Sequence, residues 1–352
     1  MIRQTSDLNS SLSRYSRQIL FTPIGEEGQR RLSASRVLLV GCGALGTHLA
    51  DTLVRAGVGF LRIVDRDYIE PNNLQRQILF DEDDIAAGLP KAEAARRKLQ
   101  RINSQVTVEG LVADANYRNI EQLAEGADLL LDGTDNFETR YLMNDLAVKT
   151  HRPWIYGACV GATGLCLPIL PDDSPCLRCV FEQAPPPEMN PTCDTAGILS
   201  PVVSIVAAHQ ALEAIKILTG HLEAVDRRLL HFDAWQNRCV HLSVAAAKTA
   251  DCPCCGQRQF DHLAGKLAAG TTTLCGRNAV QLTPAEGTRV DFTAIAAKLR
   301  AAGIADVRHN AFMLKATLDG LDATLFPDGR AILAGTQQPD QARTVYARYI
   351  GS

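Results

Sequence analysis

The sequence predicts an α/β protein with a doubly wound, mostly parallel sheet, followed by a small α+β domain. Over the first two thirds of the chain, short apolar runs of strand length alternate with segments of helical periodicity. The first apolar run ends in a glycine-rich turn, which is typical of a βαβ unit. Beyond Gly256 this alternation stops, so we expect one domain over 1–256 and a second over 257–352.

The first βαβ unit runs from residue 36 to residue 65. Residues 36–40 form an apolar run that predicts a buried parallel strand, and the turn Gly41-Cys42-Gly43-Ala44-Leu45-Gly46 follows it. Leucines at helical spacing come next, and Gly57 is expected to end their helix. A second strand over 60–64 ends in Asp65.

The rest of the first domain continues the pattern. We expect a helix over 91–102 and strands at 106–111, 129–132, 154–158, 164–169 and 229–232. The proline-rich stretch 171–195 predicts a long crossover loop, and loops of that length are often functional. The apolar run 201–220 contains four polar or charged residues, so we interpret it as a buried helix rather than a membrane span.

The second domain has its own short elements. We expect strands within 272–282, 306–317 and 323–333, helices over 292–299 and 341–349, and a hairpin turn at 327–329.

Composition excludes several classes of protein. The chain has 352 residues, 46% of them hydrophobic, which is enough for a substantial core. A formal net charge of -3 gives no indication of a nucleic-acid or membrane partner. Residues 1–16 are polar and contain no signal peptide, so we expect a cytoplasmic protein. With 11 cysteines and no secretory signal, metal binding or reactive thiols are favoured over disulfides.

The glycine turn and the acidic residue after the next strand predict a nucleotide site. A G-x-G-x-x-G turn lets backbone N–H groups approach an anion at a helix N-terminus. Asp65 is placed to accept hydrogen bonds from ribose hydroxyls. These residues define a Rossmann-like fold, and taken alone they fit NAD, FAD or ATP.

Three further residues favour ATP. Arg76 lies just beyond the strand that ends in Asp65, Lys91 stands at a predicted helix start, and Asp135 follows the strand at 129–132. Singly they read as a surface arginine, a solvated lysine and a helix cap. Because the carboxyl ends of parallel strands share one edge, together they predict a site for a triphosphate and Mg²⁺.

Two C-x-x-C pairs predict a structural zinc site that pins the crossover loop to the end of the domain. The expected ligands are Cys176, Cys179, Cys252 and Cys255, although Cys254 competes with Cys255 by proximity. The alternative is a set of buried or redox-active cysteines. Four other cysteines are expected to be small core residues: Cys42, Cys159, Cys166 and Cys239.

Cys193 lies late in the crossover loop, just before the apolar helix. A cysteine near a helix N-terminus can have a lowered pKa and raised reactivity, so we expect a functional thiol rather than an idle one.

These motifs together resemble the ThiF/MoeB family, the bacterial relatives of ubiquitin-activating enzymes. The resemblance covers 1–256 and rests on Arg14-Tyr15-Ser16-Arg17-Gln18-Ile19, the glycine turn, Asp65 with Asp67, Asn73-Leu74-Gln75-Arg76-Gln77, Pro90-Lys91, Thr134-Asp135-Asn136 and the C-x-x-C pairs. The tail is similar to a C-terminal extension of longer ThiF-like proteins, and no rhodanese-like loop is present.

The resemblance implies an adenylyltransferase that uses ATP and Mg²⁺ to activate the C-terminal glycine of a ubiquitin-fold sulfur carrier ending in Gly-Gly. It implies a homodimer in which Arg17 reaches the partner's nucleotide, and a loop cysteine at Cys193 that bonds to the carrier or carries sulfur. For the tail we expect a stabilising role, with docking of the carrier or contact with a sulfurtransferase as the alternatives. The carrier would be ThiS- or MoaD-like, for thiamine or molybdopterin biosynthesis. We expect ATP and its metal at Gly41, Gly43, Ala44, Gly46, Asp65, Asp67, Asn73, Arg76, Gln77, Lys91, Asp135 and Asn136.

Adenylation chemistry agrees with this residue set. The nucleophile is a carboxylate that is already ionised, so the reaction needs positive charge and positioning rather than a general base. We expect Arg17, Arg76, Lys91 and a metal at Asp135 to supply that charge. The alternative, an NAD(P)-linked oxidoreductase on the same fold, leaves Arg76, Lys91 and Asp135 without a role.

Overall fold

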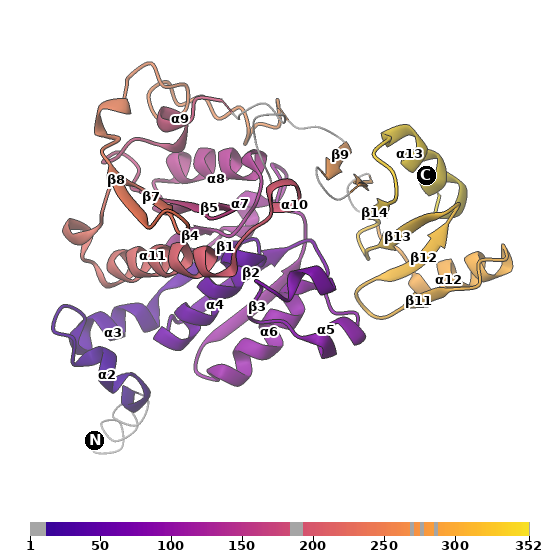
Figure 1. Cartoon of the computed structure of the whole chain (residues 1–352), viewed down its shortest axis with the longest axis horizontal. Coiled ribbons are helices and arrows are strands. Elements are labelled where there is room, and N and C mark those ends of the chain that lie inside the picture. The colour runs from indigo at the N-terminus through magenta and orange to yellow at the C-terminus, as the bar shows by residue number, and fades with distance from the viewer. Residues whose placement is uncertain (1–11, 184–192, 268–270, 275–277, 285–287, 352) are drawn as a thin grey trace. The chain divides into compact units, whose positions relative to one another are not determined.

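The computed structural model describes residues 12–183, 193–267, 271–274, 278–284 and 288–351 (Figure 1). The chain divides into two compact units, the first spanning 1–190 and 198–266 and the second spanning 191–197 and 267–352.

Unit 1 is built on an eight-stranded sheet in the order β3-β2-β1-β4-β5-β6-β7-β8 (Figure 1). Neighbouring strands from β3 to β5 pair in parallel, whereas those from β5 to β8 pair antiparallel. The α/β fold class is therefore confirmed, with a second, antiparallel half in the same sheet. The strands are β1 (Arg36–Val40), β2 (Phe60–Asp65), β3 (Thr107–Val112), β4 (Leu129–Asp132), β5 (Trp154–Val160), β6 (Thr163–Ile169), β7 (Leu229–Asp233) and β8 (Arg238–Leu242).

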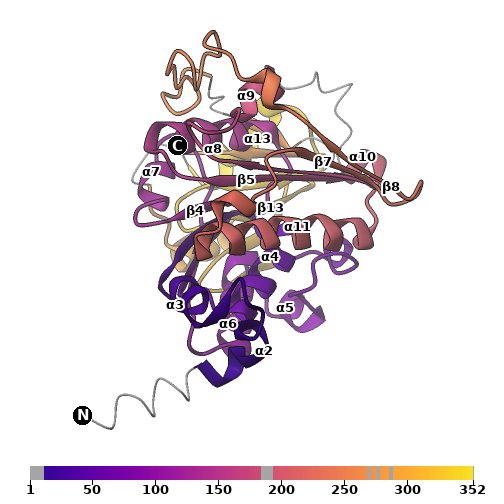
Figure 2. The same cartoon turned by 90° about the vertical axis from the view of Figure 1, so that its left-hand side faces the viewer.

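Helices cover both faces of this sheet, as in a doubly wound fold (Figures 1 and 2). One face carries α3 (Gly25–Ala34), α4 (Ala44–Ala56), α6 (Lys91–Ile102) and α11 (Ser200–Thr219). The other carries α7 (Ile120–Leu123) and α8 (Phe137–Thr150), whose apolar residues share a buried cluster with Leu38, Leu130 and Trp154. Shorter helices are η1 (Ser13–Tyr15), α2 (Ser16–Ile19), η2 (Pro71–Asn73), α5 (Glu82–Ala86), α9 (Leu177–Val180), η4 (Leu222–Ala224) and η5 (Ala245–Ala247).

α11 is the most apolar of these helices. Its length and composition would allow it to cross a membrane, but 56% of the apolar window is buried inside the protein. It packs against α4 and against β5 and β6. Gly220, in the left-handed conformation with φ 90°, ends it.

Unit 2 has a six-stranded antiparallel sheet in the order β11-β12-β13-β14-β10-β9. α12 and α13 bury Phe292, Leu299 and Val345 in a core with the strands. The segments 272–282 and 306–317, expected to hold strands, each contain two. The elements are α10 (Cys193–Ala196), β9 (Thr271–Leu274), β10 (Ala279–Leu282), α12 (Phe292–Ala301), β11 (Val307–His309), β12 (Leu314–Leu318), β13 (Leu321–Leu325), β14 (Ala331–Ala334) and α13 (Pro339–Tyr349).

Candidate active site

The glycine turn connects β1 to the N-terminus of α4. Gly41 has φ +89°, and a Cβ there would lie 2.6 Å from the carbonyl group of Gly133. A Cβ on Gly46 would lie 2.1 Å from the Gly41 oxygen, so no larger side chain fits at either position. Gly43 differs, because a Cβ there would meet only Gln77 Nε2, at 3.8 Å. Beside Gly43 and Ala44 the turn therefore leaves open space at a helix N-terminus, as anion binding requires.

Asp65 ties the end of β2 to this turn. Its Oδ2 accepts a hydrogen bond from the Cys42 N–H at 2.6 Å, and its Oδ1 accepts one from the Asp67 N–H at 2.7 Å. Burial raises the pKa of Asp65 and outweighs the opposing effect of Lys91. A carboxylate has about four lone-pair sites, so Asp65 keeps capacity for a ribose hydroxyl.

Lys91 begins α6 and is only 2% exposed. Its Nζ lies 3.3 Å from Asp67 Oδ2, and its N–H donates to the Asp67 carbonyl at 2.9 Å. Burial is the main cause of the raised pKa of Cys42, and the Lys91 charge acts against it. The lysine ammonium therefore lies within electrostatic range of the glycine turn.

The segment 71–77 folds against the same turn. Asn73 is buried, and its Oδ1 accepts from the Glu70 N–H at 3.2 Å. Gln77 is 3% exposed, and its Oε1 is buried without a hydrogen-bond partner. Arg76 is partly exposed and donates to the Asn72 carbonyl at 2.7 Å. An unpaired buried amide oxygen is costly, so the Gln77 side chain suits a site that a ligand completes.

Asp135 and Asn136 follow β4 and join this edge of the sheet through Gly133. Asp135 is exposed, whereas the Asn136 Oδ1 caps α8 by accepting from the Thr139 N–H at 2.9 Å. A Cβ on Gly41 would lie 2.9 Å from the Thr134 nitrogen, which shows how closely the two loops approach.

A buried ion pair that the sequence did not reveal holds the loop before Asp135. Arg140 Nε lies 3.0 Å from Asp132 Oδ2, and Arg140 also donates to the Thr134 carbonyl at 2.8 Å. Burial would lower the pKa of Arg140, but the Asp132 carboxylate raises it. Gln210 of α11 donates to the Asp132 carbonyl at 2.9 Å. In the sequence, the only indication of this network was the presence of polar residues such as Gln210 within otherwise apolar runs.

Arg17 does not lie with this group. The neighbouring Gln18 donates to the Ala56 carbonyl at 3.1 Å, so α2 sits at the C-terminal end of α4. The glycine turn is at the other end of this 13-residue helix, about 20 Å away at 1.5 Å per residue. Arg17 is exposed and cannot reach the glycine turn of its own chain.

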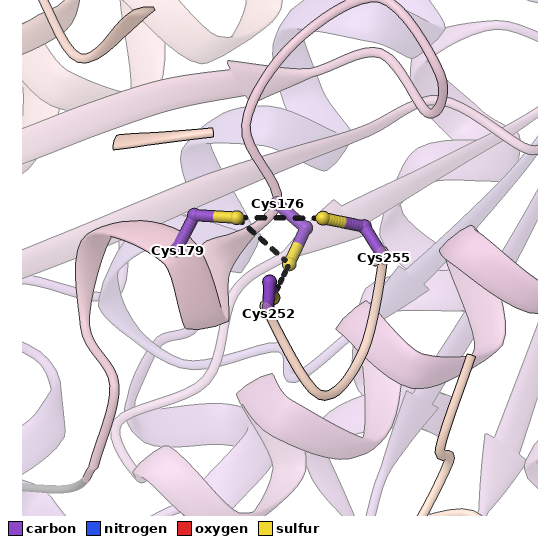
Figure 3. A group of neighbouring side chains, drawn as sticks. All are labelled: Cys176, Cys179, Cys252 and Cys255. Carbon is purple, nitrogen blue, oxygen red and sulfur yellow. Dashed lines mark hydrogen bonds between the residues drawn. The ribbon is translucent and has the colours of Figure 1, made fainter. Parts of the chain in front are cut away.

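The four predicted zinc ligands come together (Figure 3). Cys176 Sγ lies 3.8 Å from Cys179 Sγ and 3.6 Å from Cys252 Sγ, and Cys179 Sγ lies 3.4 Å from Cys255 Sγ. Zinc–sulfur bonds of about 2.3 Å in a tetrahedron place sulfurs about 3.8 Å apart. The four thiols therefore fit a structural zinc ion that joins the chain after β6 to the chain after β8.

Residues of α8 form hydrogen bonds with the segments that carry the four cysteines. Asn144 donates from Nδ2 to Cys254 Sγ at 3.2 Å, and its Oδ1 accepts from the Leu177 N–H at 2.8 Å. Asp145 Oδ2 accepts from the His262 N–H at 3.0 Å. Cys254 is fully buried and lies outside the group of four.

The remaining cysteines differ in burial. Cys42 and Cys166 are buried, as expected of core residues, whereas Cys159 is half-buried. The expectation for Cys239 is wrong, because its side chain is exposed on β8. Cys193 begins α10 and is half-buried, and it groups with unit 2.

Several proteins of known name are similar in sequence to this chain. A model described as "ThiF family" matches residues 15–254. The chain is 45% identical over 96% of its length to the "Sulfur carrier protein ThiS adenylyltransferase" of Bacillus subtilis, of which it covers 99%. It is 40% identical over 72% of its length to the "SAMP-activating enzyme E1" of Haloferax volcanii, of which it covers 92%. It is 37% identical over 70% of its length to the "Sulfur carrier protein adenylyltransferase" of Thermus thermophilus, of which it covers 91%.

Solved structures agree with the fold. The structure of E. coli MccB with ATP aligns with a TM-score of 0.60 at 24% identity, over 69% of this chain and 74% of that one. None of the relatives named above carries the name of an oxidoreductase, so the NAD(P)-linked alternative finds no support.

Proposed function

The chain belongs to the ThiF family, and from this premise we propose that it is an ATP-dependent adenylyltransferase that activates a ubiquitin-like sulfur carrier protein. The reaction joins the C-terminal carboxylate of the carrier to AMP as an acyl-adenylate and releases pyrophosphate. A ThiS-like carrier ending in Gly-Gly, and hence thiamine biosynthesis, is favoured over a MoaD-like one. The support is the similarity to the Bacillus subtilis protein, which extends over both units.

The buried lysine beside the glycine turn is the observation that carries this proposal. Lys91 is 2% exposed at the N-terminus of α6, next to Asp67 and in electrostatic range of Asp65 and Cys42. Burying an ammonium costs free energy unless charge compensates it. A dinucleotide site already holds its pyrophosphate at a helix N-terminus, so it has no need of this cation. A triphosphate does, because its leaving pyrophosphate gains negative charge in the transition state.

Each residue at this edge of the sheet has a role in that reaction. The N–H groups of the glycine turn, with Asp65 and Asn73, bind and orient the nucleotide. Lys91 and Arg76 offset the repulsion between the carrier carboxylate and the phosphates. Asp67 holds the Lys91 ammonium in place, at 3.3 Å. The described parts of these motifs contain no histidine, which agrees with a nucleophile that needs no general base.

Mg²⁺ belongs to the proposal through Asp135. Its exposed carboxylate lies one loop away from the glycine turn, and hard cations prefer such oxygen ligands. The Asp132–Arg140 pair fixes the preceding residues of this loop. We assign the remaining predicted contacts, Gln77 and Asn136, to the orientation of the phosphates and of the loop.

Arg17 enters the proposal only in a homodimer. It lies about 20 Å from the glycine turn of its own chain, by the length of α4. We propose that it completes the partner subunit's site, which makes the dimer the catalytic unit.

Zinc, Cys193 and unit 2 complete the proposal. Zn²⁺ at the four cysteines is structural, because all four ligands come from the protein and no position stays open for catalysis. Cys193 attacks the acyl-adenylate, which forms a thioester with the carrier and releases AMP, or it takes sulfane sulfur from a persulfide of a sulfurtransferase, which leaves that enzyme with a free thiol. We place the adenylation domain at 1–256 and assign no chemistry to 257–352. The cytoplasm is the proposed location.

Carrier-dependent exchange of labelled pyrophosphate into ATP tests the function. The purified chain, a ThiS-like carrier, ATP and Mg²⁺ should give exchange that disappears when the two C-terminal glycines of the carrier are removed. The melting temperature of the protein should rise with ATP and stay constant with NAD(H), because a ligand stabilises the protein only if it binds the native state. Stabilisation by NAD(H) without exchange would overturn the proposal.

A further inference from the structure

β8 carries an exposed cysteine that adenylation does not use. β8 is the edge strand of the sheet in unit 1 (Figure 1). All five of its residues are exposed. Cys239 pairs across the ladder with Phe232, and His241 pairs with Leu230. Residues two apart on a strand share one face, so the thiol and the imidazole lie side by side. Their closest atoms, Cys239 Sγ and His241 Nε2, are 4.0 Å apart.

Asp226 contacts the other nitrogen of this imidazole. The distance between His241 Nδ1 and Asp226 Oδ2 is 2.8 Å. Arg228 donates two hydrogen bonds to the same carboxylate, from Nε to Oδ1 at 2.8 Å and from Nη2 to Oδ2 at 2.8 Å. These bonds are the main reason that the pKa of Asp226 is lowered to about 2. The carboxylate is therefore ionised at neutral pH and can only accept hydrogen bonds.

An accepting carboxylate fixes the tautomer of His241. In the neutral imidazole, Nδ1 carries the proton that is donated to Asp226, which leaves the lone pair on Nε2. That lone pair is on the nitrogen next to the Cys239 thiol. A nucleophile beside a base that a third group orients is the arrangement of an activated thiol.

The charged groups of α11 near Asp226 pair with one another or with the backbone. Glu213 of α11 accepts from Lys216 Nζ at 2.6 Å and from the Asp226 N–H at 3.1 Å. Burial is the main cause of the lowered pKa of His209, which lies on α11. His209 is therefore neutral at pH 7. Within the described ranges, the one group of cysteine, histidine and acidic side chains with metal-ligand spacing is the four-cysteine cluster, so a metal at Cys239 is not indicated.

We propose that Cys239, His241 and Asp226 form a thiol-exchange site that reacts with a small disulfide. The Cys239 sulfur attacks one sulfur of the disulfide, forming a new S–S bond as the old one breaks. The thiol proton passes to His241 Nε2 and then to the departing thiolate, which leaves as a free thiol. Cys239 is oxidised and the disulfide is reduced by the same electron pair, so no further oxidant is needed. The product is a mixed disulfide on the edge strand.

The test measures the rate of modification at each cysteine. The full chain is exposed to oxidised glutathione for timed intervals between pH 6 and 9, quenched with acid and analysed by peptide-resolved mass spectrometry. Cys239→Ser identifies the site, and His241→Gln and Asp226→Asn remove the base and its orienting group. His231→Gln is the matched control, because His231 pairs with Val240 and so lies on the opposite face.

In the wild type, Cys239 should react faster than the half-buried thiols Cys159 and Cys193, and a reductant should reverse the modification. General-base assistance predicts that His241→Gln slows Cys239 by at least about tenfold at pH 7, with Asp226→Asn intermediate. His231→Gln should leave the rate unchanged. Equal Cys239 rates in wild type, His241→Gln and Asp226→Asn across the pH range would overturn the proposal. If His241→Gln does not fold, as judged by its melting curve, Asp226→Asn and the wild-type pH profile decide alone.

Discussion

Lys91 is deeply buried, and its ammonium forms an ion pair with Asp67 at 3.3 Å. Burying these charges costs free energy, so we interpret the pair as retained for function. The segment 71–77 contains a second costly feature, because the buried side-chain oxygen of Gln77 has no hydrogen-bond partner in the protein. Both residues lie at the glycine turn. At the scale of single residues, both features agree with the proposal that a bound nucleotide completes the site.

Replacing Lys91 with Met should abolish most adenylation while keeping the fold. Loss of a charge partner in the transition state predicts a fall of about 10² or more in pyrophosphate exchange. Lys149→Met is the matched control, because Lys149 pairs with Glu121 on the surface at the C-terminal end of α8. Exchange within threefold of wild type in Lys91→Met would remove Lys91 from the mechanism.

Asp145 predicts a pH dependence of stability. Burial is the main cause of its pKa of about 6, against roughly 3.9 in the unfolded chain. A raised native pKa means that the native state holds the proton more tightly. This contribution to stability is fully present below about pH 3.9 and is lost as the pH rises through 6, by roughly 2–3 kcal/mol.

Urea unfolding of wild type and Asp145→Asn between pH 4.5 and 7 measures this effect. The asparagine oxygen can still accept from the His262 N–H, which the wild-type carboxylate does at 3.0 Å. The wild type should lose stability relative to the variant as the pH rises. A difference that stays constant over this range would show that Asp145 is ionised throughout.

At the scale of elements, the sequence predicted those with a simple pattern. α6 begins at Lys91 directly after Pro90, and β4 spans the expected residues 129–132, because each is a continuous helical or apolar run. α8 was missed because Arg140, Asn144 and Asp145 are buried on it, which erases the amphipathic pattern. β8 was missed because all of its residues are exposed and no face alternates.

The candidate site also contains some residues that the sequence predicted and others that it did not. The glycine turn, Asp65 and Lys91 could be predicted because they occupy fixed positions at strand and helix ends. The Asp132–Arg140 pair and the Cys239–His241–Asp226 group could not. Their members meet only through tertiary packing and strand register, which no local spacing encodes.

The four-cysteine cluster predicts how the elements around it respond to metal. Cys252→Ser should lose zinc and lower the melting temperature, because a missing ligand opens the link between the chain after β6 and the chain after β8. Cys254→Ser should keep its zinc, since Cys254 lies outside the group of four and accepts a hydrogen bond from Asn144. Metal analysis and melting curves check both. Loss of zinc from Cys254→Ser with retention in Cys255→Ser would reverse the ligand assignment.

At the scale of the whole molecule, we expect each active site to combine Lys91 of one subunit with Arg17 of the other. Arg17→Ala and Lys91→Ala should each be inactive alone. Mixed dimers of the two should recover activity, because one of their two sites then has both residues intact. An equal mixture at exchange equilibrium should reach about a quarter of wild-type activity.

Lys91→Ala mixed with Asp135→Ala is the control for subunit exchange. Both residues are proposed to act in their own chain, so no mixed dimer contains an intact site. Recovery in this pair, or none in the first pair, would contradict an arginine that acts across the interface.

The length of α4, which separates Arg17 from the glycine turn of its own chain, has a consequence for dosage. Under the proposed sharing of Arg17, a lone copy would have the nucleotide ligands of its own chain, lack the partner's arginine and turn over nothing. Output should therefore scale with the square of protein concentration under strong dilution, so that sparse expression keeps the pathway silent without any inhibitor.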